Sequence, residues 1–181
     1  VIFLRIFKML RFAILGWGRI SQRHSDLLGN SQIEGAELIA VADSKFDKAK
    51  ILADKKNVKA YSDMHEMMSI EKPDVVAILT ESGNHAKHVI ELAPYKADLL
   101  VEKPMALTLE DADKMIETCD HHGVRLFVVK QNRFNLPVIQ LRKALEDGRF
   151  GKLVLGTVRV RWCRTQAYYD QDDWRGTWAY D

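Results

Sequence analysis

The sequence has little of several features that mark specialised classes of protein. Cysteine occurs only twice in 181 residues, as Cys119 and Cys163, and no C-x-x-C spacing is present. This excludes a disulfide-built scaffold and favours two reduced thiols in a cytoplasmic protein. Basic and acidic residues number 27 and 25, a net charge of +2. So small a balance gives no electrostatic reason to expect a nucleic-acid partner.

Long apolar runs are also lacking. The start of the chain, VIFLRIFKML, is interrupted by Arg5 and Lys8, whereas a membrane-spanning helix needs about 20 mostly apolar residues. A secretory signal peptide carries its charges before the apolar region rather than inside it. The sequence therefore predicts no membrane partner and a cytoplasmic location, with Met9 as a candidate natural start.

Short apolar runs alternate with amphipathic stretches over the first 130 residues. Continuous apolar runs are typical of strands in a parallel sheet that is covered on both faces. We expect an α/β fold, a doubly wound parallel (Rossmann) sheet over residues 10–130. The expected strands are 11–15, 37–43, 59–61, 75–79, 98–104 and 124–129.

Two of the intervening helices have recognisable starts. Ser44 is the predicted N-cap of a helix that ends near residue 56. Thr108, with Asp111 three residues later, is the predicted cap of a helix that Gly123 ends.

The pattern changes after residue 130. A helix is predicted over residues 137–148, and after it Val158, Val160 and Trp162 alternate with more polar residues. A period of two predicts a strand with one wet face, as in an antiparallel sheet. We expect residues 131–181 to be the beginning of a second, incomplete α+β domain.

A glycine-rich turn, Gly-Trp-Gly-Arg-Ile-Ser, follows the first predicted strand. Its first glycine permits a tight turn, its second lets a pyrophosphate approach the backbone, and Ser21 takes the third small-residue position. The following helix offers N–H groups and a positive dipole to phosphates. Asp43 ends the next predicted strand, where a carboxylate can bind a ribose diol and would repel a 2′-phosphate. The alternative is an ordinary turn near an unrelated aspartate. The predicted NAD-binding residues are Gly16, Trp17, Gly18, Arg19, Ile20 and Asp43.

A second candidate feature is VEKP, residues 101–104, at the carboxyl end of a later predicted strand. Ligands bind at that edge of open α/β sheets. A lysine there can polarise a hydroxyl or accept its proton. The alternative is a solvated Glu102–Lys103 pair on a loop.

Taken together, G-x-G-x-x-S, VAD at 41–43, TESGNH at 80–85 and EKP at 102–104 resemble the glucose-fructose oxidoreductase/inositol dehydrogenase family. The resemblance implies a Rossmann domain joined to an open antiparallel sheet, and homo-oligomers in full-length relatives. It makes residues 131–181 the beginning of an incomplete domain for substrate binding and oligomerisation. Residues 126–138 and 156–181 are similar to the UDP-N-acetyl-2-amino-2-deoxyglucuronate 3-dehydrogenases. In that family NAD oxidises the 3′-hydroxyl of a UDP-GlcNAc uronic acid, a nucleotide sugar, for polysaccharides such as the O-antigen of lipopolysaccharide.

The resemblance also implies roles for single residues. Lys103 would be the catalytic lysine, and the bond between it and Pro104 is often cis in the family. Further cofactor contacts would be Thr80, Ser82, His85, Glu102, Lys103 and Gln131. Substrate contacts would be Asn132, Arg133, Trp174 and Arg175. The two arginines can grip a carboxylate or diphosphate bidentately, or be surface residues. No metal is expected, because no third ligand accompanies His85 and His88.

One departure keeps alternatives open. In the family, the sequence beyond the position of Asp181 contains glycines and a histidine that acts with the catalytic lysine on the substrate hydroxyl. The sequence therefore predicts an NAD-dependent oxidoreductase acting on a UDP-N-acetylamino-hexuronic acid, with two alternatives. One is a dehydrogenase for another sugar or inositol, and the other is a truncated, inactive NAD-binding remnant.

Overall fold

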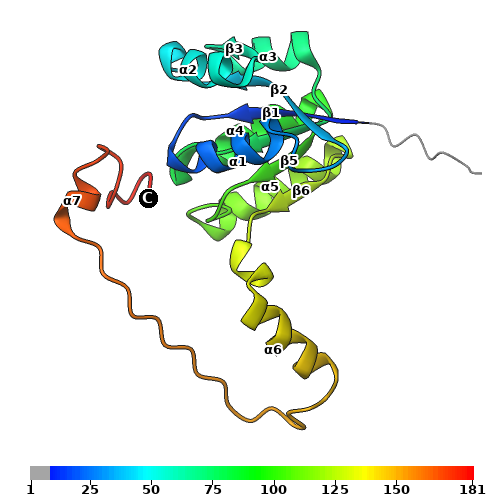
Figure 1. Ribbon diagram of the computed structural model, residues 1–181, viewed down its shortest axis with the longest axis vertical. Helices are drawn as coiled ribbons and strands as arrows, with labels where there is room; N and C mark the ends of the chain where they lie inside the picture. Colours follow the sequence, from blue (N-terminus) through cyan, green and yellow to red (C-terminus); the bar gives the residue numbers. More distant parts are fainter. Residues whose placement is uncertain (1–8) are drawn as a thin grey trace, which may run out of the picture.

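In the computed structural model, which describes residues 9–181, six parallel strands form one sheet (Figure 1). The strand order is β3-β2-β1-β4-β5-β6. The first strand, β1, therefore lies inside the sheet, with β2 and β3 on one side of it and β4 to β6 on the other. This confirms the doubly wound sheet. The prediction for the apolar start falls largely on residues 1–8, outside the described residues. The strands are β1 (Leu10–Leu15), β2 (Ala36–Ala42), β3 (Lys59–Tyr61), β4 (Val75–Ile78), β5 (Asp98–Val101) and β6 (Leu126–Val128).

Helices cover both faces of the sheet. Adjacent residues of the fully buried β4 belong to different cores: Val76 lies in one hydrophobic cluster with Met67, and Ala77 lies in the other with Leu52. This is why the strands carry continuous apolar runs. None of the helices within residues 9–181 is long and apolar enough to cross a membrane. The helices among the strands are α1 (Arg19–Gly29), α2 (Phe46–Lys56), α3 (Met64–Glu71), η1 (Ser82–Asn84), α4 (His85–Leu92), η2 (Ala93–Tyr95) and α5 (Leu109–His122).

One predicted helix cap is confirmed and one is wrong. The Asp111 amide donates to Thr108 Oγ at 3.1 Å, and Gly123 ends α5 with φ of +68°. Ser44, by contrast, is not a cap, because α2 begins at Phe46 after Lys45. No side chain caps α2, and the Lys45 amide before it donates to the Asp43 carboxylate at 2.8 Å.

The chain beyond the sheet contains η3 (Gln131–Phe134), α6 (Leu136–Glu146) and α7 (Gln166–Tyr169). The predicted helix is present as α6, but the strand predicted around Val158–Trp162 is wrong. Residues 152–165 form an extended connection between α6 and α7 (Figure 1), and Val158, Val160 and Trp162 are exposed. A strand requires a neighbour to take its backbone hydrogen bonds, and no other strand within residues 9–181 pairs with this segment.

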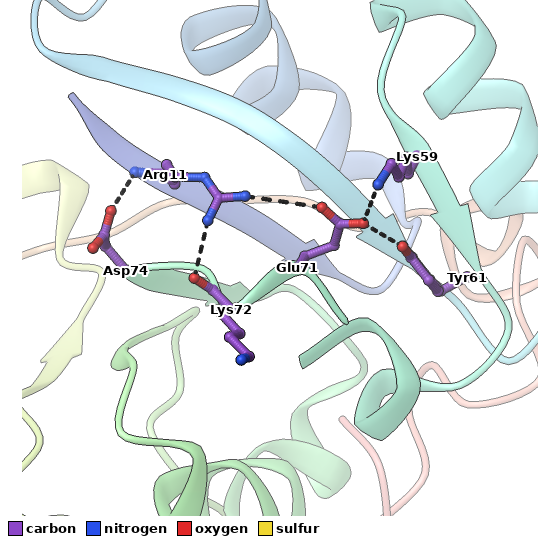
Figure 2. Close-up of polar contacts among 6 residues, drawn as sticks. All are labelled: Arg11, Lys59, Tyr61, Glu71, Lys72 and Asp74. Atoms are coloured by element: carbon purple, nitrogen blue, oxygen red, sulfur yellow. Dashed lines mark hydrogen bonds and ion pairs between the residues drawn. The ribbon is translucent and has the colours of Figure 1, made fainter. Parts of the chain in front are cut away.

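A buried carboxylate ties α3 to the sheet (Figure 2). Glu71, the last residue of α3, is only 7% exposed and accepts hydrogen bonds from Tyr61 Oη and, at 2.8 Å, from Lys59 Nζ. Arg11 Nη2 lies 3.9 Å from the same carboxylate, and Arg11 Nη1 donates to the Lys72 carbonyl at 3.3 Å. One side chain thereby joins the end of α3 to both β1 and β3.

The partners of Glu71 decide which charge state the fold favours. Burial acts to raise the pKa of the Glu71 carboxyl, but hydrogen bonds from Lys59 and Tyr61 together bring it below 4.5. Burial and the bond to Glu71 raise the pKa of Tyr61 to about 12. The Glu71 contribution to stability is therefore present above the unfolded pKa and is lost as the pH falls through the lower folded pKa. The Tyr61 contribution is present below pH 10 and is lost as the pH rises toward about 12.

We predict that Glu71→Gln lowers the free energy of unfolding by about 1–3 kcal/mol at pH 7, because charged hydrogen bonds are lost from a buried site. Urea unfolding measures this, and the difference from wild type should shrink as the pH falls below 4.5. Glu66→Gln, on the exposed face of α3, is the control and should change stability by no more than about 0.5 kcal/mol. Equal stability of Glu71→Gln and wild type at pH 7 would contradict the assigned role of the carboxylate.

Candidate active site

The glycine-rich turn packs directly against the loop that follows β4. Gly16 has φ of +95°, and a Cβ built on it would lie 2.8 Å from Thr80 Cγ2 and 2.9 Å from the Thr80 amide nitrogen. Any larger residue at position 16 would therefore push the two loops apart. Glycine is required here both by backbone conformation and by space.

Ser21 closes the turn from inside. It is fully buried, its hydroxyl donates to the Gly16 carbonyl at 2.6 Å, and it accepts from the Gly18 amide at 3.1 Å. The small third residue also lets α1 lie close to the sheet. Gly18, Arg19 and Ile20 are exposed at the start of α1. The N–H groups of this first turn can therefore reach a phosphate, as the sequence predicts.

Asp43 lies beside the glycine-rich turn, as expected from its place at the end of β2. One carboxylate oxygen accepts the Trp17 amide at 2.7 Å, and the other accepts the Lys45 amide at 2.8 Å. Each oxygen can accept more than one hydrogen bond, so the carboxylate can also bind the two hydroxyls of a ribose. The Trp17 bond fixes Asp43 to the phosphate-binding turn.

His85 lies under this edge and not on its surface. Its ring is 1% exposed, with Nδ1 at 2.7 Å from the Pro104 carbonyl oxygen and Nε2 at 3.0 Å from that of Thr80. It links the loops after β4 and β5. Ser82 is buried nearby in η1, and the Thr80 hydroxyl lies 3.0 Å from His88 Nδ1. Burial lowers the pKa of His88.

Glu102 and Lys103 follow β5 at the same edge. Lys103 is exposed, and its bond to Pro104 is cis, as the family resemblance implies. Glu102 is buried; one oxygen accepts the Lys103 amide at 3.1 Å, and the other lies 3.1 Å from His24 Nε2. Burial acts to raise the pKa of Glu102, but these two hydrogen bonds together lower it. Because Glu102 is buried, the two residues are not a solvated Glu-Lys pair, which was the alternative.

His24 was missed by the sequence analysis. It lies on α1, one turn after Ser21, whose buried position defines the side of the helix that faces the sheet. That spacing could have identified His24 as a residue near the sheet, but its partner Glu102 is 78 positions away in the sequence.

The end of the chain returns to the carboxyl edge of the sheet (Figure 1). The Gly83 amide donates to the Tyr180 carbonyl at 3.3 Å, and a Cβ at Gly83 would overlap the Ala179 carbonyl oxygen. Gly83 thus lets the final residues contact the loop after β4. The sequence analysis did not single out this glycine.

Trp174 and Arg175 belong to this returning segment. The Arg175 side chain is mostly buried, and its Nε lies 2.8 Å from Asp172 Oδ2 as an ion pair, without the alignment of a hydrogen bond. Its guanidinium stacks 4.5 Å from the Tyr168 ring and 5.4 Å from the Trp174 ring. Arg175 is therefore not a surface arginine, which was the alternative in the sequence analysis. Its contacts lie within its own segment.

Gln131, Asn132 and Arg133 lie in η3, directly after β6, and all three are exposed. In the described part of the chain, no hydrogen bond or ion pair joins their side chains to the glycine-rich turn or to Lys103. Within residues 9–181 no group of three His, Cys, Asp or Glu side chains could hold a metal ion.

Comparison with known proteins relates this edge to dehydrogenases. Residues 10–130 match the GFO/IDH/MocA family model, described as an oxidoreductase family with an NAD-binding Rossmann fold. A myo-inositol 2-dehydrogenase from Thermotoga maritima is 34% identical over 144 residues, which are 79% of this chain and 42% of that protein. A D-glucoside 3-dehydrogenase from Escherichia coli is 32% identical over 83% of this chain and 43% of that protein. The chain thus spans less than half the length of these relatives.

Solved structures extend the comparison. The WlbA dehydrogenase from Bordetella pertussis, in complex with NADH and UDP-GlcNAcA, superposes with a TM-score of 0.91 and 37% identity over 96% of this chain and 52% of that one. The WlbA dehydrogenase from Chromobacterium violaceum superposes with a TM-score of 0.91 and 35% identity, over 98% of this chain and 51% of that one. A myo-inositol dehydrogenase structure from Sinorhizobium meliloti has a TM-score of 0.71 and 27% identity, over 78% of this chain and 42% of that one.

The glycine turn, the aspartate that ends β2 and the family match over residues 10–130 agree. The chain belongs to the GFO/IDH/MocA family of oxidoreductases, and its sheet is an NAD-binding Rossmann fold.

Proposed function

We propose that the protein oxidises the 3′-hydroxyl of a UDP-N-acetylamino-hexuronic acid with NAD. One observation carries the proposal: the likeness to the WlbA dehydrogenases, crystallised with NADH and UDP-GlcNAcA, extends over 96–98% of the chain. The myo-inositol dehydrogenase structure covers 78% of it. Coverage of 96–98% means that the likeness continues well beyond residues 10–130, which a purely Rossmann-level similarity would not do.

The arrangement of the chain's own groups supports this chemistry. Bound NAD would supply the acceptor for a hydride from the carbon that bears the hydroxyl. The turn from Gly16 to Ile20 and the N-terminus of α1 would bind the pyrophosphate, and Asp43 would bind the adenosine ribose. Lys103, exposed at the same edge, would accept the hydroxyl proton as the carbonyl forms.

Further parts of the proposal concern the whole protein. We assign residues 10–130 to the NAD-binding domain and 131–181 to the beginning of a substrate domain, in a cytoplasmic homo-oligomer that serves lipopolysaccharide synthesis. Thr80, Ser82 and Gln131 would lie near the cofactor. Asn132, Arg133, Trp174 and Arg175 would lie near the sugar nucleotide. Oxidation of a cyclitol is the second candidate, favoured by the 34% identity to a myo-inositol 2-dehydrogenase.

We predict that Asp43→Ser weakens NAD binding at least tenfold. The variant loses charged hydrogen bonds to the ribose, worth about 1.5–3 kcal/mol, and also the acceptor of the Trp17 amide. Calorimetric titration of the 181-residue chain with NAD measures the dissociation constant. Asp54→Ser, an exposed aspartate on α2, should bind like wild type. If Asp43→Ser also bound like wild type, Asp43 would not be the ribose ligand.

We predict that Lys103→Met lowers turnover of UDP-GlcNAcA about 100-fold or more, the low end of acid–base contributions, and leaves NAD affinity within about twofold. Formation of NADH is followed by absorbance, with myo-inositol as the competing substrate. Lys50→Met, exposed on α2, is the matched control. Unchanged turnover in Lys103→Met would remove Lys103 from the chemistry, and faster oxidation of myo-inositol would favour the second candidate.

A further inference from the structure

We propose that His24 is a positioning residue that fastens the Glu102–Lys103 loop to the dinucleotide-binding helix α1. The inference rests on the proposed function, in which Lys103 receives the substrate proton. His24 itself acts only through Glu102.

The contact is a specific one between distant parts of the chain. His24 Nε2 lies 3.1 Å from Glu102 Oε1, and both side chains are mostly buried, with 16% and 9% of their surface exposed. The other carboxylate oxygen of Glu102 accepts the Lys103 amide at 3.1 Å. A continuous path of two hydrogen bonds therefore runs from the α1 side chain to the backbone of the lysine.

The helix is built to reach this loop. The buried residues of α1 are Ser21, Ser25 and Leu28, so two of the three are small. Small side chains let the helix axis approach the strand ends closely, and His24 lies on the same side, one position before Ser25. The His24 side chain is long enough to contact Glu102, which directly follows β5.

The lysine loop is held from two directions. His24 holds Glu102 on one side of Lys103, and His85 Nδ1 lies 2.7 Å from the carbonyl oxygen of Pro104 on the other. The backbone around Lys103 is thus fixed while its side chain is exposed. A fixed backbone with a free side chain is what a group needs to reach a reacting hydroxyl reproducibly.

The location of His24 also gives the contact a functional meaning. The first turn of α1 would bind the pyrophosphate, and His24 follows on the same rigid helix. One helix thereby sets the position of both the cofactor and the lysine loop. Without His24, the buried Glu102 carboxylate keeps, among residues 9–181, only the Lys103 amide as a hydrogen-bond donor. A buried charge that has lost a partner draws water or turns toward solvent.

Amide hydrogen exchange of the 181-residue chain, followed residue by residue by NMR, tests the proposal without needing turnover. The informative pair is His24→Asn and His24→Gln, because both carry an amide but only the longer glutamine reaches Glu102. Arg23→Ala, exposed on the same helix, is the control. The Leu99 amide, which donates to the Arg125 carbonyl within the sheet, reports on global stability.

We expect the Lys103 amide to exchange at least tenfold faster in His24→Asn than in wild type, with Leu99 unchanged. In His24→Gln and Arg23→Ala the rate should stay within about threefold of wild type. Wild-type exchange at Lys103 in His24→Asn would overturn the proposal. Equal acceleration at Lys103 and Leu99 would also overturn it, because the effect would then be loss of overall stability.

Turnover provides the second readout. In the oxidation of UDP-GlcNAcA, His24→Asn should lower kcat about tenfold while KM for NAD stays within twofold, and His24→Gln should restore most of kcat. An unchanged kcat would overturn the positioning role. Absence of turnover in the wild-type protein would instead contradict the proposed function, and the exchange rates would still decide on His24.

Discussion

The close approach of Gly16 to Thr80 is the constraint on which the rest of the site depends. With its φ of +95° and the Thr80 atoms within 3 Å of where a Cβ would be, the turn can lie against the end of β4 only if residue 16 has no side chain. That contact directs the chain into α1 with its N-terminus at the carboxyl edge of the sheet. The exposed first turn of α1, the Asp43 carboxylate on the Trp17 amide and the reach of His24 all follow from the position of this helix.

Around this contact, polar groups hold the loops of the edge together. Ser21 closes the glycine-rich turn, and His85 joins the loops after β4 and β5. Glu102 connects the lysine loop to α1. A buried polar group costs stability unless its hydrogen bonds are made. The edge is therefore organised so that the buried groups bind one another while the Lys103 side chain is exposed, and the same logic governs Glu71 at the end of α3.

The sequence predicted the sheet and the glycine turn between β1 and α1 because both are local patterns. Continuous apolar runs specify buried parallel strands, and a glycine turn between a strand and a helix specifies the pyrophosphate site. What it did not predict depends on groups far apart in the chain. The His24–Glu102 pair joins residues 78 positions apart. The alternation at Val158–Trp162 favours a strand, but pairing requires a second strand, and none within residues 9–181 lies beside it. At Ser44 the prediction failed because α2 begins at Phe46, with Lys45 at its N-cap position and no side-chain cap.

We infer that this chain carries an NAD site in which Asp43 selects NAD over NADP. The most direct measurement is calorimetric titration of the 181-residue chain with NAD and then with NADP. We expect clear binding of NAD and at least tenfold weaker binding of NADP, because the Asp43 carboxylate would bind a ribose diol and would repel a 2′-phosphate. Equal affinity for the two dinucleotides would contradict the role of Asp43, and binding of neither would contradict the site itself.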